Sequence, residues 1–158
     1  MAELLWRVRE HNVGSIPASV HPLDEMRDWM RDVMFQEYDV WVAEAVHTVA
    51  EPAADSLAGG ATSARALTGF MALRQPDWLE HLYVDRECAS QGLGARFLEV
   101  ARRELSGSRI QLWTFQSNSG ACRFYERQGF SAVQWTDGDN EEGAPDIRYR
   151  WVRPGRPV

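Results

Sequence analysis

The feature that most restricts the fold is a strand pattern that passes through a short loop into two glycines and then into an amphipathic helix. Residues 78–84 read as a strand, and residues 92–105 place apolar side chains at helical spacing. Gly92 and Gly94 stand where the loop enters this helix. Glycine lets a backbone approach a ligand closely, and the first N–H groups of a helix have no partner within it. The pattern therefore predicts an anion site that suits a diphosphate.

This segment differs from the dinucleotide-binding fingerprint, because Phe97 stands where a third glycine is required. A glycine pair before a helix is also typical of an ordinary tight turn. The segment alone therefore leaves a phosphate site and a plain turn open.

The rest of the chain indicates one α/β domain over residues 1–158, with a mixed sheet and helices packed on it. Residues 51–64 are small or polar and contain a glycine pair, which predicts a long, mobile hairpin loop rather than a domain boundary. The patterns predict helices over residues 23–35, 92–105 and 119–128, and strands over residues 40–44, 66–73, 78–84, 110–115, 130–135 and 147–152.

The N-terminal residues 2–11 fit two interpretations. Leu5 and Val8 have helical spacing, whereas Leu4, Trp6 and Val8 alternate as in a strand. We favour the helix, which leaves the sheet without a first edge strand. An uncovered strand edge invites dimerisation or a cover, so both a monomer and a homodimer remain open.

Composition excludes several classes of function. The chain has 158 residues with 17 basic and 23 acidic side chains, a net charge of −6, and every basic residue is arginine. It therefore lacks both the basic surface that grips nucleic acid and the lysine of a P-loop or a Schiff base. No apolar run reaches the roughly 20 residues of a membrane helix, and the charged N-terminus is unlike a secretion signal, so we expect a cytoplasmic protein with no membrane partner. Two separated cysteines and four scattered histidines predict no metal site.

A second segment, residues 112–130 (LWTFQSNSGACRFYERQGF), indicates which of the two interpretations of the turn applies. Together with residues 82–98 it resembles the GNAT superfamily of acyl-CoA-dependent N-acetyltransferases, including bacterial members of unassigned substrate, and the resemblance spans residues 20–152. It implies a central, mostly antiparallel sheet with helices on both faces, and acetyl-CoA as co-substrate. It also implies direct attack by a primary amine, of a small molecule or a peptide N-terminus, in a ternary complex.

The resemblance also implies which residues hold the cofactor. The family usually has Gln or Arg three residues before the first glycine of the phosphate-binding turn, where this chain has Ala89. One phosphate contact is therefore absent, or Arg86 or Arg96 replaces it. The residues expected to bind CoA are Leu82, Tyr83 and Val84 for the pantetheine arm, Gln91, Gly92, Gly94 and Ala95 for the diphosphate, and Asn118 for the pantetheine or the helix start.

Amine attack on a thioester needs a base for the ammonium proton and an acid for the leaving thiolate. By resemblance, Tyr125 is the acid. Glu80 is our candidate base, because the resemblance implies that the matching position often carries the base, and strand alternation places it on one face with Trp78 and Leu82. His81 is the alternative, since a β-bulge exchanges faces. A backbone N–H near Leu82 is the expected oxyanion donor.

Residues 136–146 contain five carboxylates, which predicts a solvated connection or a site for a cationic amine. For the second interpretation we name Glu141, Glu142 and Asp146, with Trp78 as a further residue of the acceptor pocket. Two rival functions remain. A catalytically weak CoA-binding sensor would fit Ala89, and an interaction domain would use an exposed sheet edge.

Overall fold

The computed structural model describes residues 1–49 and 62–155. Its helical segments are α1 (Ala2–His11), α2 (Leu23–Trp29), the π-helical turn η1 (Met30–Met34), α3 (Phe35–Glu37), the 3-10 turn η2 (Arg86–Cys88), α4 (Leu93–Glu104) and α5 (Ser119–Arg127). The strands are β1 (Asp39–Val49), β2 (Thr62–Arg74), β3 (Trp78–Val84), β4 (Arg109–Phe115), β5 (Ser131–Thr136) and β6 (Asp146–Val152).

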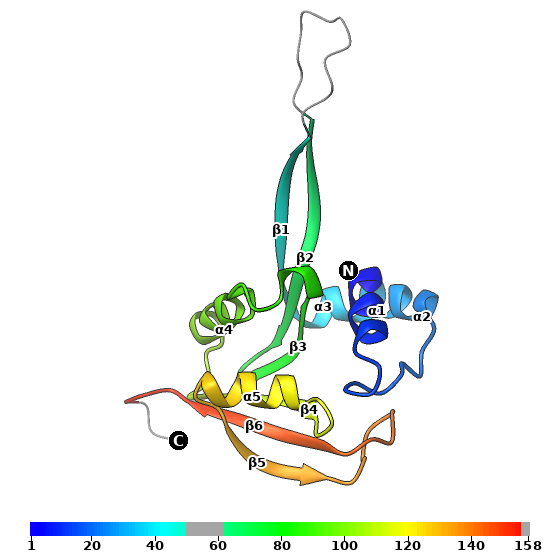
Figure 1. Cartoon of the computed structure of the whole chain (residues 1–158). Coiled ribbons are helices and arrows are strands. Elements are labelled where there is room, and N and C mark those ends of the chain that lie inside the picture. Colours follow the sequence, from blue (N-terminus) through cyan, green and yellow to red (C-terminus); the bar gives the residue numbers. More distant parts are fainter. Residues whose placement is uncertain (50–61, 156–158) are drawn as a thin grey trace, which may run out of the picture.

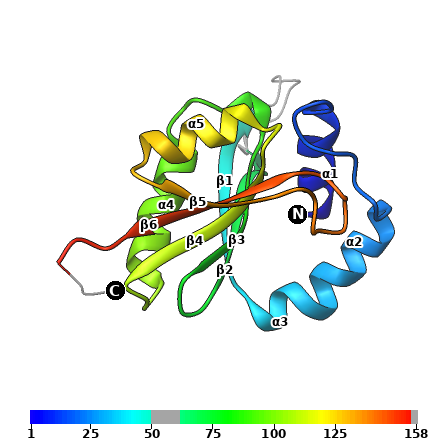
Figure 2. The same ribbon diagram turned by 90° about the horizontal axis from the view of Figure 1, so that it is seen from below.

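All six strands lie in one sheet, in the order β1-β2-β3-β4-β6-β5. Neighbouring strands are antiparallel except β3 and β4, which are parallel. Helices α4 and α5 cover one face, and α1, α2 and α3 lie on the other side (Figure 2). The mixed, mostly antiparallel sheet with helices on both faces is thus confirmed.

The middle of β2 shows how this sheet supports two cores. Residues 70–73, Phe-Met-Ala-Leu, are all fully buried. Met71 and Leu73 join the core under α4 and α5, whereas Phe70 and Ala72 join the core of α1 and α2. Successive side chains of a strand point to opposite faces, so a continuous apolar run marks a strand that is covered on both sides.

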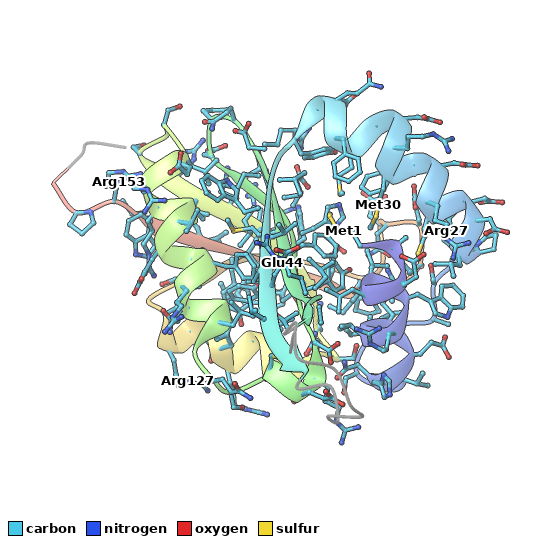
Figure 3. The ribbon with its side chains drawn as sticks, turned by 90° about the horizontal axis from the view of Figure 1, so that it is seen from above. Met1, Arg27, Met30, Glu44, Arg127 and Arg153 are labelled. Carbon is cyan, nitrogen blue, oxygen red and sulfur yellow. The ribbon has the colours of Figure 1, made fainter. Side chains whose placement is uncertain are left out.

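The N-terminus is the predicted helix, and the strand interpretation of Leu4, Trp6 and Val8 is wrong. Leu4 and Leu5 are adjacent and only 2% and 5% exposed, which a helix packed at an angle allows and a one-sided strand does not. Within the described residues no strand precedes α1, so β1 is an edge of the sheet. Figure 3 shows Met1, the residue before α1, close to Met30 of η1, on the side of the sheet opposite to α4.

The helix predicted over residues 23–35 is present, and it extends to Glu37 with a π-helical turn in its middle. Met26, Met30 and Met34 are buried at a spacing of four residues and face the second core. Nothing in the sequence predicted the π-helical turn, which is a change of hydrogen bonding rather than of side-chain pattern.

Strands β1 and β2 are longer than predicted and form a hairpin that projects from the body of the molecule (Figure 1). Residues 62–64 belong to β2, so the expected loop over residues 51–64 is wrong at that end. The remainder of that loop prediction lies outside the described residues.

Candidate active site

The turn between β3 and α4 uses the left-handed backbone conformation twice. Ser90 has φ 63° and Gly92, the residue before α4, has φ 84°. At the start of the turn the Asp85 carboxylate accepts a hydrogen bond from the N–H of Glu87 at 3.2 Å. A left-handed conformation suits glycine but costs other residues about 1–2 kcal/mol, so Ser90 is the strained position of the turn.

This turn holds a row of unused backbone donors. Among the described residues, no N–H from Ser90 to Ala95 has a hydrogen-bond acceptor, whereas the next, that of Arg96, donates to the Gly92 carbonyl at 3.1 Å. Gln91 and Gly92 are exposed. The four residues predicted for the diphosphate, Gln91, Gly92, Gly94 and Ala95, are therefore brought together with their N–H groups available, which is what an anion requires.

The side chains around the turn divide into partnered and unpartnered groups. The Gln91 amide donates to the Glu87 carbonyl at 2.8 Å, so Gln91 offers its backbone rather than its side chain. Arg86 and Arg96 form no ion pair with any described residue. The predicted replacement of the Ala89 contact by Arg86 or Arg96 is therefore not blocked by an acidic partner among the described residues.

Gly94 has a second role, in packing. A Cβ at Gly94 would lie 3.1 Å from the Phe124 ring of α5, tighter than an ordinary contact. Glycine therefore lets the first turn of α4 lie directly against α5, so that both helices border the turn.

The sheet is split beside this turn. Strands β3 and β4 share a single residue pair, Trp78 with Gln111, and then diverge. On its other side β3 stays paired with β2, where Leu82, Tyr83 and Val84 oppose residues 69–71. Among the described strands, the edge of residues 82–84 that faces β4 is therefore unpaired, and an extended ligand can pair with such an edge.

A buried group of hydrogen bonds fixes the point at which the split begins. Asp77 is only 6% exposed, and its carboxylate accepts from Arg109 at 2.8 Å and from the Gln111 amide at 3.0 Å. The Asp77 carbonyl also accepts from the Gln111 N–H, and the Gly107 N–H donates to the Pro76 carbonyl, both at 2.8 Å. These bonds tie β4 to the start of β3.

Helix α5 supplies the other two predicted residues. Asn118 caps the helix, because its side-chain oxygen accepts from the Ala121 N–H at 3.1 Å. Tyr125 is 8% exposed and lies among the rings of Phe124, Phe130 and Tyr149. Burial raises the pKa of the Tyr125 phenol well above its usual value, and proximity to Tyr83 adds to this, so the phenol retains its proton.

The two candidate bases lie on the same side of the sheet, contrary to the predicted alternation. A register shift between Ala72 and Leu73 makes Glu80 the extra residue of a β-bulge. Leu79 and Leu82 consequently both face α4 and α5, so the shared face predicted for Glu80 and Leu82 is wrong. The Glu80 carboxylate instead accepts from Arg74 at 2.7 Å. Arg74 follows Leu73, which faces α4 and α5, so by strand alternation Arg74 points to the side of α2 and α3, and its partner Glu80 lies there too.

His81 lies within an aromatic cluster formed with Trp29, Tyr38 and Tyr83, at ring-centroid distances of 5.3, 6.3 and 6.2 Å. Burial is the main reason that the pKa of His81 is lowered to about 4, and the Arg9 charge lowers it further. The imidazole is therefore neutral near pH 7.

A partly buried ion pair joins the two halves of the molecule on this side. Arg9 of α1 donates to Glu142, in the connection between β5 and β6, at 2.7 Å, and the two side chains are 12% and 16% exposed. Arg9 also donates to the Pro17 carbonyl at 3.1 Å, and its charge counteracts the rise that burial causes in the pKa of Tyr83. Sequence reasoning missed Arg9, because nothing in the pattern of α1 indicates what its polar face meets.

The acidic residues predicted for the substrate have separate environments. Glu141 contacts exposed His21 at 3.1 Å. Asp146 is 9% exposed, and its two oxygens accept from the Thr136 hydroxyl and, at 3.1 Å, from the Asn140 amide. Asp146 and Glu142 border one cavity of about 390 Å³ together with Trp113 and Phe115, whereas Glu141 and Trp78 do not.

Within the part of the chain that the structure describes, no group of three His, Cys, Asp or Glu side chains could hold a metal ion. Among the same residues no helix is long and apolar enough to cross a membrane.

Comparison with known proteins identifies the family. Residues 28–153 match the sequence model of the acetyltransferase (GNAT) domain. The chain is a GNAT acetyltransferase. It is thus an acyl-CoA-dependent enzyme that transfers acetyl groups. None of the curated protein sequences matches this acetyltransferase.

Solved structures share the fold of this acetyltransferase at low sequence identity. YjaB from Escherichia coli is 17% identical, with 97% of this chain and 89% of that chain covered and a TM-score of 0.63. An acetyltransferase from Thermus thermophilus is 18% identical over 96% and 90% of the chains, with a TM-score of 0.60. The NatC complex bound to Gag peptide and CoA contains a chain that is 14% identical over 96% and 89%, with a TM-score of 0.56.

Proposed function

We propose that this acetyltransferase moves the acetyl group of acetyl-CoA to a primary amine by direct attack in a ternary complex. The observation that carries the proposal is the row of free N–H groups from Ser90 to Ala95, next to the unpaired edge of residues 82–84. The free N–H groups suit a diphosphate, and the unpaired strand edge suits an extended arm that carries amide groups. CoA contains a diphosphate that is joined directly to such an arm. The NatC structure, bound to CoA and a peptide, supports the same choice of ligands.

Tyr125 is the proposed general acid. Its phenol is buried, protonated and carried by α5, the helix that packs against the first turn of α4. A thiolate that leaves beside this phenol takes up its proton. Asn118 holds the start of α5 through its cap and so positions Tyr125 along the helix axis.

Glu80 is the proposed base and His81 the alternative. The bulge sets Glu80 two residues beyond the last contact of β3 with β4, at the beginning of the split. His81 is enclosed by aromatic rings and forms no hydrogen bond with a described residue, so it has less access to an incoming ammonium group. The Leu82 N–H remains the proposed oxyanion donor.

Two measurements test the proposal. Isothermal titration calorimetry should show CoA binding, and Gly92→Val, which adds a branched side chain to a left-handed position, should weaken it at least tenfold. With acetyl-CoA and a panel of primary amines, thiol release should fall about 100-fold or more in Tyr125→Phe while CoA affinity stays unchanged. The proposal is overturned if no amine accelerates thiol release. CoA binding without any transfer would instead favour the sensor function.

A further inference from the structure

Tyr149 of β6 is hydrogen-bonded to the residue that follows the proposed acid. Tyr149 is only 1% exposed, and its hydroxyl donates to the Glu126 carboxylate at 2.8 Å. Glu126 follows Tyr125 directly in α5, which lies over β6 (Figure 1). Among the described residues Glu126 forms no ion pair, although Arg123 and Arg127 belong to the same helix. The carboxylate of this exposed residue therefore serves as the acceptor that a buried phenol needs.

The Tyr149 ring also contacts the Tyr125 ring, with centroids 6.0 Å apart and an angle of 37° between the planes. Among the described residues, Phe124 and Phe130 provide the other ring contacts of Tyr125, at centroid distances of 5.2 and 5.7 Å. Phe124 belongs to α5, and Phe130 follows its end, where the Phe130 N–H donates to the Tyr125 carbonyl at 3.0 Å. Both of these rings therefore accompany the helix if it moves, and Tyr149 is the ring that fixes Tyr125 relative to the sheet.

The backbone of Tyr149 is held on both sides. It pairs with Leu112 of β4 and with Ala132 of β5, in two antiparallel ladders. Its side chain belongs to the core under α4 and α5. Strand β4 is also the strand that diverges from β3 after their single residue pair. Tyr149 consequently ties α5 to the half of the sheet that lies across the split from the unpaired edge of residues 82–84.

The two contacts of Tyr149 restrain the rotation of α5 about its own axis. Successive residues of an α-helix are about 100° apart around this axis. The Tyr149 hydroxyl holds Glu126 and the Tyr149 ring contacts Tyr125, so one side chain engages the helix in two directions. Proton transfer needs about 2.6–3.2 Å between the two heavy atoms, and a misplacement of about 1 Å can cost about 100-fold in rate. The direction of the Tyr125 phenol therefore depends on this restraint.

From this arrangement we infer that Tyr149 is a positioning residue for acetyl transfer, which holds α5 at the rotation that directs the Tyr125 phenol toward the leaving thiolate. The inference rests on the proposed function, because it requires Tyr125 to be the acid. Tyr149 is enclosed in the core and transfers no proton itself, so it acts only through Tyr125. Glu126 is the second member of this contact, since its carboxylate accepts the Tyr149 hydrogen bond.

Tyr149→Phe removes the hydroxyl and leaves the ring in place. With acetyl-CoA and the most active amine of the panel, we expect kcat to fall about tenfold, because the phenol of Tyr125 is no longer held in one direction. KM for acetyl-CoA and the calorimetric Kd of CoA should change by less than about twofold, because the turn between β3 and α4 is unaltered. In a Tyr125→Phe background, Tyr149→Phe should cause no further loss of kcat. A merely structural role would add its own loss to that of Tyr125→Phe.

Two substitutions at Glu126 form a matched pair that leaves the core intact. Glu126→Gln retains an oxygen that accepts the hydrogen bond and should keep kcat within about twofold of the wild type. Glu126→Ala removes the acceptor at an exposed position and should lower kcat as much as Tyr149→Phe does. The double variant with Tyr149→Phe should be no slower than either single variant. If Tyr149→Phe fails to fold, this pair alone decides the inference.

The outcomes separate the inference from the proposed function. Unchanged kcat in Tyr149→Phe and Glu126→Ala, beside a slow Tyr125→Phe, overturns the inference and leaves the proposed function standing. A further loss on adding Tyr149→Phe to Tyr125→Phe has the same meaning. Transfer by Tyr125→Phe at the wild-type rate removes Tyr125 as the acid and overturns the inference with it. Absence of transfer to every amine overturns both.

Discussion

Substitution of Gly107 by alanine tests the hydrogen-bonded group at which β3 and β4 meet. A Cβ at Gly107 would lie 2.8 Å from the Asp77 Cβ and 2.9 Å from the Pro76 carbonyl oxygen. Both distances are well below ordinary contact, and neither neighbour is the end of a flexible side chain. The loop before β4 must therefore move away from Asp77.

The cost follows from two contributions. Overpacking of the contact with buried Asp77 costs about 1–3 kcal/mol. Weakening of one hydrogen bond to the buried Asp77 carboxylate costs about 1–3 kcal/mol more. Alanine restores up to about 1 kcal/mol, because it lowers the conformational entropy of the unfolded chain. We expect the free energy of unfolding to fall by about 2–4 kcal/mol, which lowers Tm by about 5–15 °C.

Urea denaturation followed by tryptophan fluorescence measures this change. Gly120→Ala is the control, because a Cβ there meets only the Asn118 side chain at 3.6 Å in the first turn of α5, and stability should stay within about 0.5 kcal/mol or rise. If Gly107→Ala unfolds at the same urea concentration as the wild type, the contact at Asp77 does not constrain the structure as described.

Four further changes have defined expectations. At Gly92 a Cβ would meet no neighbouring atom, but the backbone there is left-handed (φ 84°), a conformation that costs alanine energy. Gly92→Ala should therefore lower the stability or the CoA affinity by about 1–2 kcal/mol. Unchanged stability and CoA affinity would exclude strain at this turn. His81, whose pKa is lowered to about 4 in the folded chain from 6.5, binds its proton more readily when unfolded. Unfolding free energy should therefore fall between about pH 6.5 and pH 4, by up to about 3 kcal/mol, and His81→Phe should remove this slope. Glu142→Gln leaves the Arg9 charge without its partner and should destabilise by about 1–3 kcal/mol, with less additional loss in the double variant with Arg9→Gln. Additive losses would show that the two side chains do not interact. Tyr125→Phe should retain stability and CoA affinity but lose transfer at every pH tested, since a buried phenol is protonated throughout; recovery at low pH would assign the acid elsewhere.

Much of the fold was accessible from sequence, because side-chain periodicity and turn residues act locally. The α4 pattern and the glycines at residues 92 and 94 predicted the strand–turn–helix junction, and the helix predicted over residues 119–128 is α5, which is followed by Gly129 with a positive φ of 83°. Adjacent burial of Leu4 and Leu5 decided between helix and strand at the N-terminus, and this depends on tertiary packing that periodicity alone cannot reveal.

The site was less accessible, because its geometry depends on one irregularity and on contacts between distant segments. The bulge at Glu80 inverts the alternation of β3, and no residue type in that strand indicates it. The pairing of Arg9 with Glu142 joins residues far apart in the chain. Local sequence specified the turn for which we propose diphosphate binding, whereas the arrangement on the side of the proposed acceptor had to be read from the structure.

The single residue pair between β3 and β4 has a mechanical consequence. Every other neighbouring pair of strands is bound by a ladder, but among the described residues Trp78 and Gln111 form the only rung at the centre of the sheet. The two halves of the sheet are therefore held to each other by the packed side chains under α4 and α5 and by the bonds around Asp77, rather than by a backbone ladder. The gap that opens beyond this rung leaves backbone groups of β3 without a strand partner while the layer beneath it stays closed.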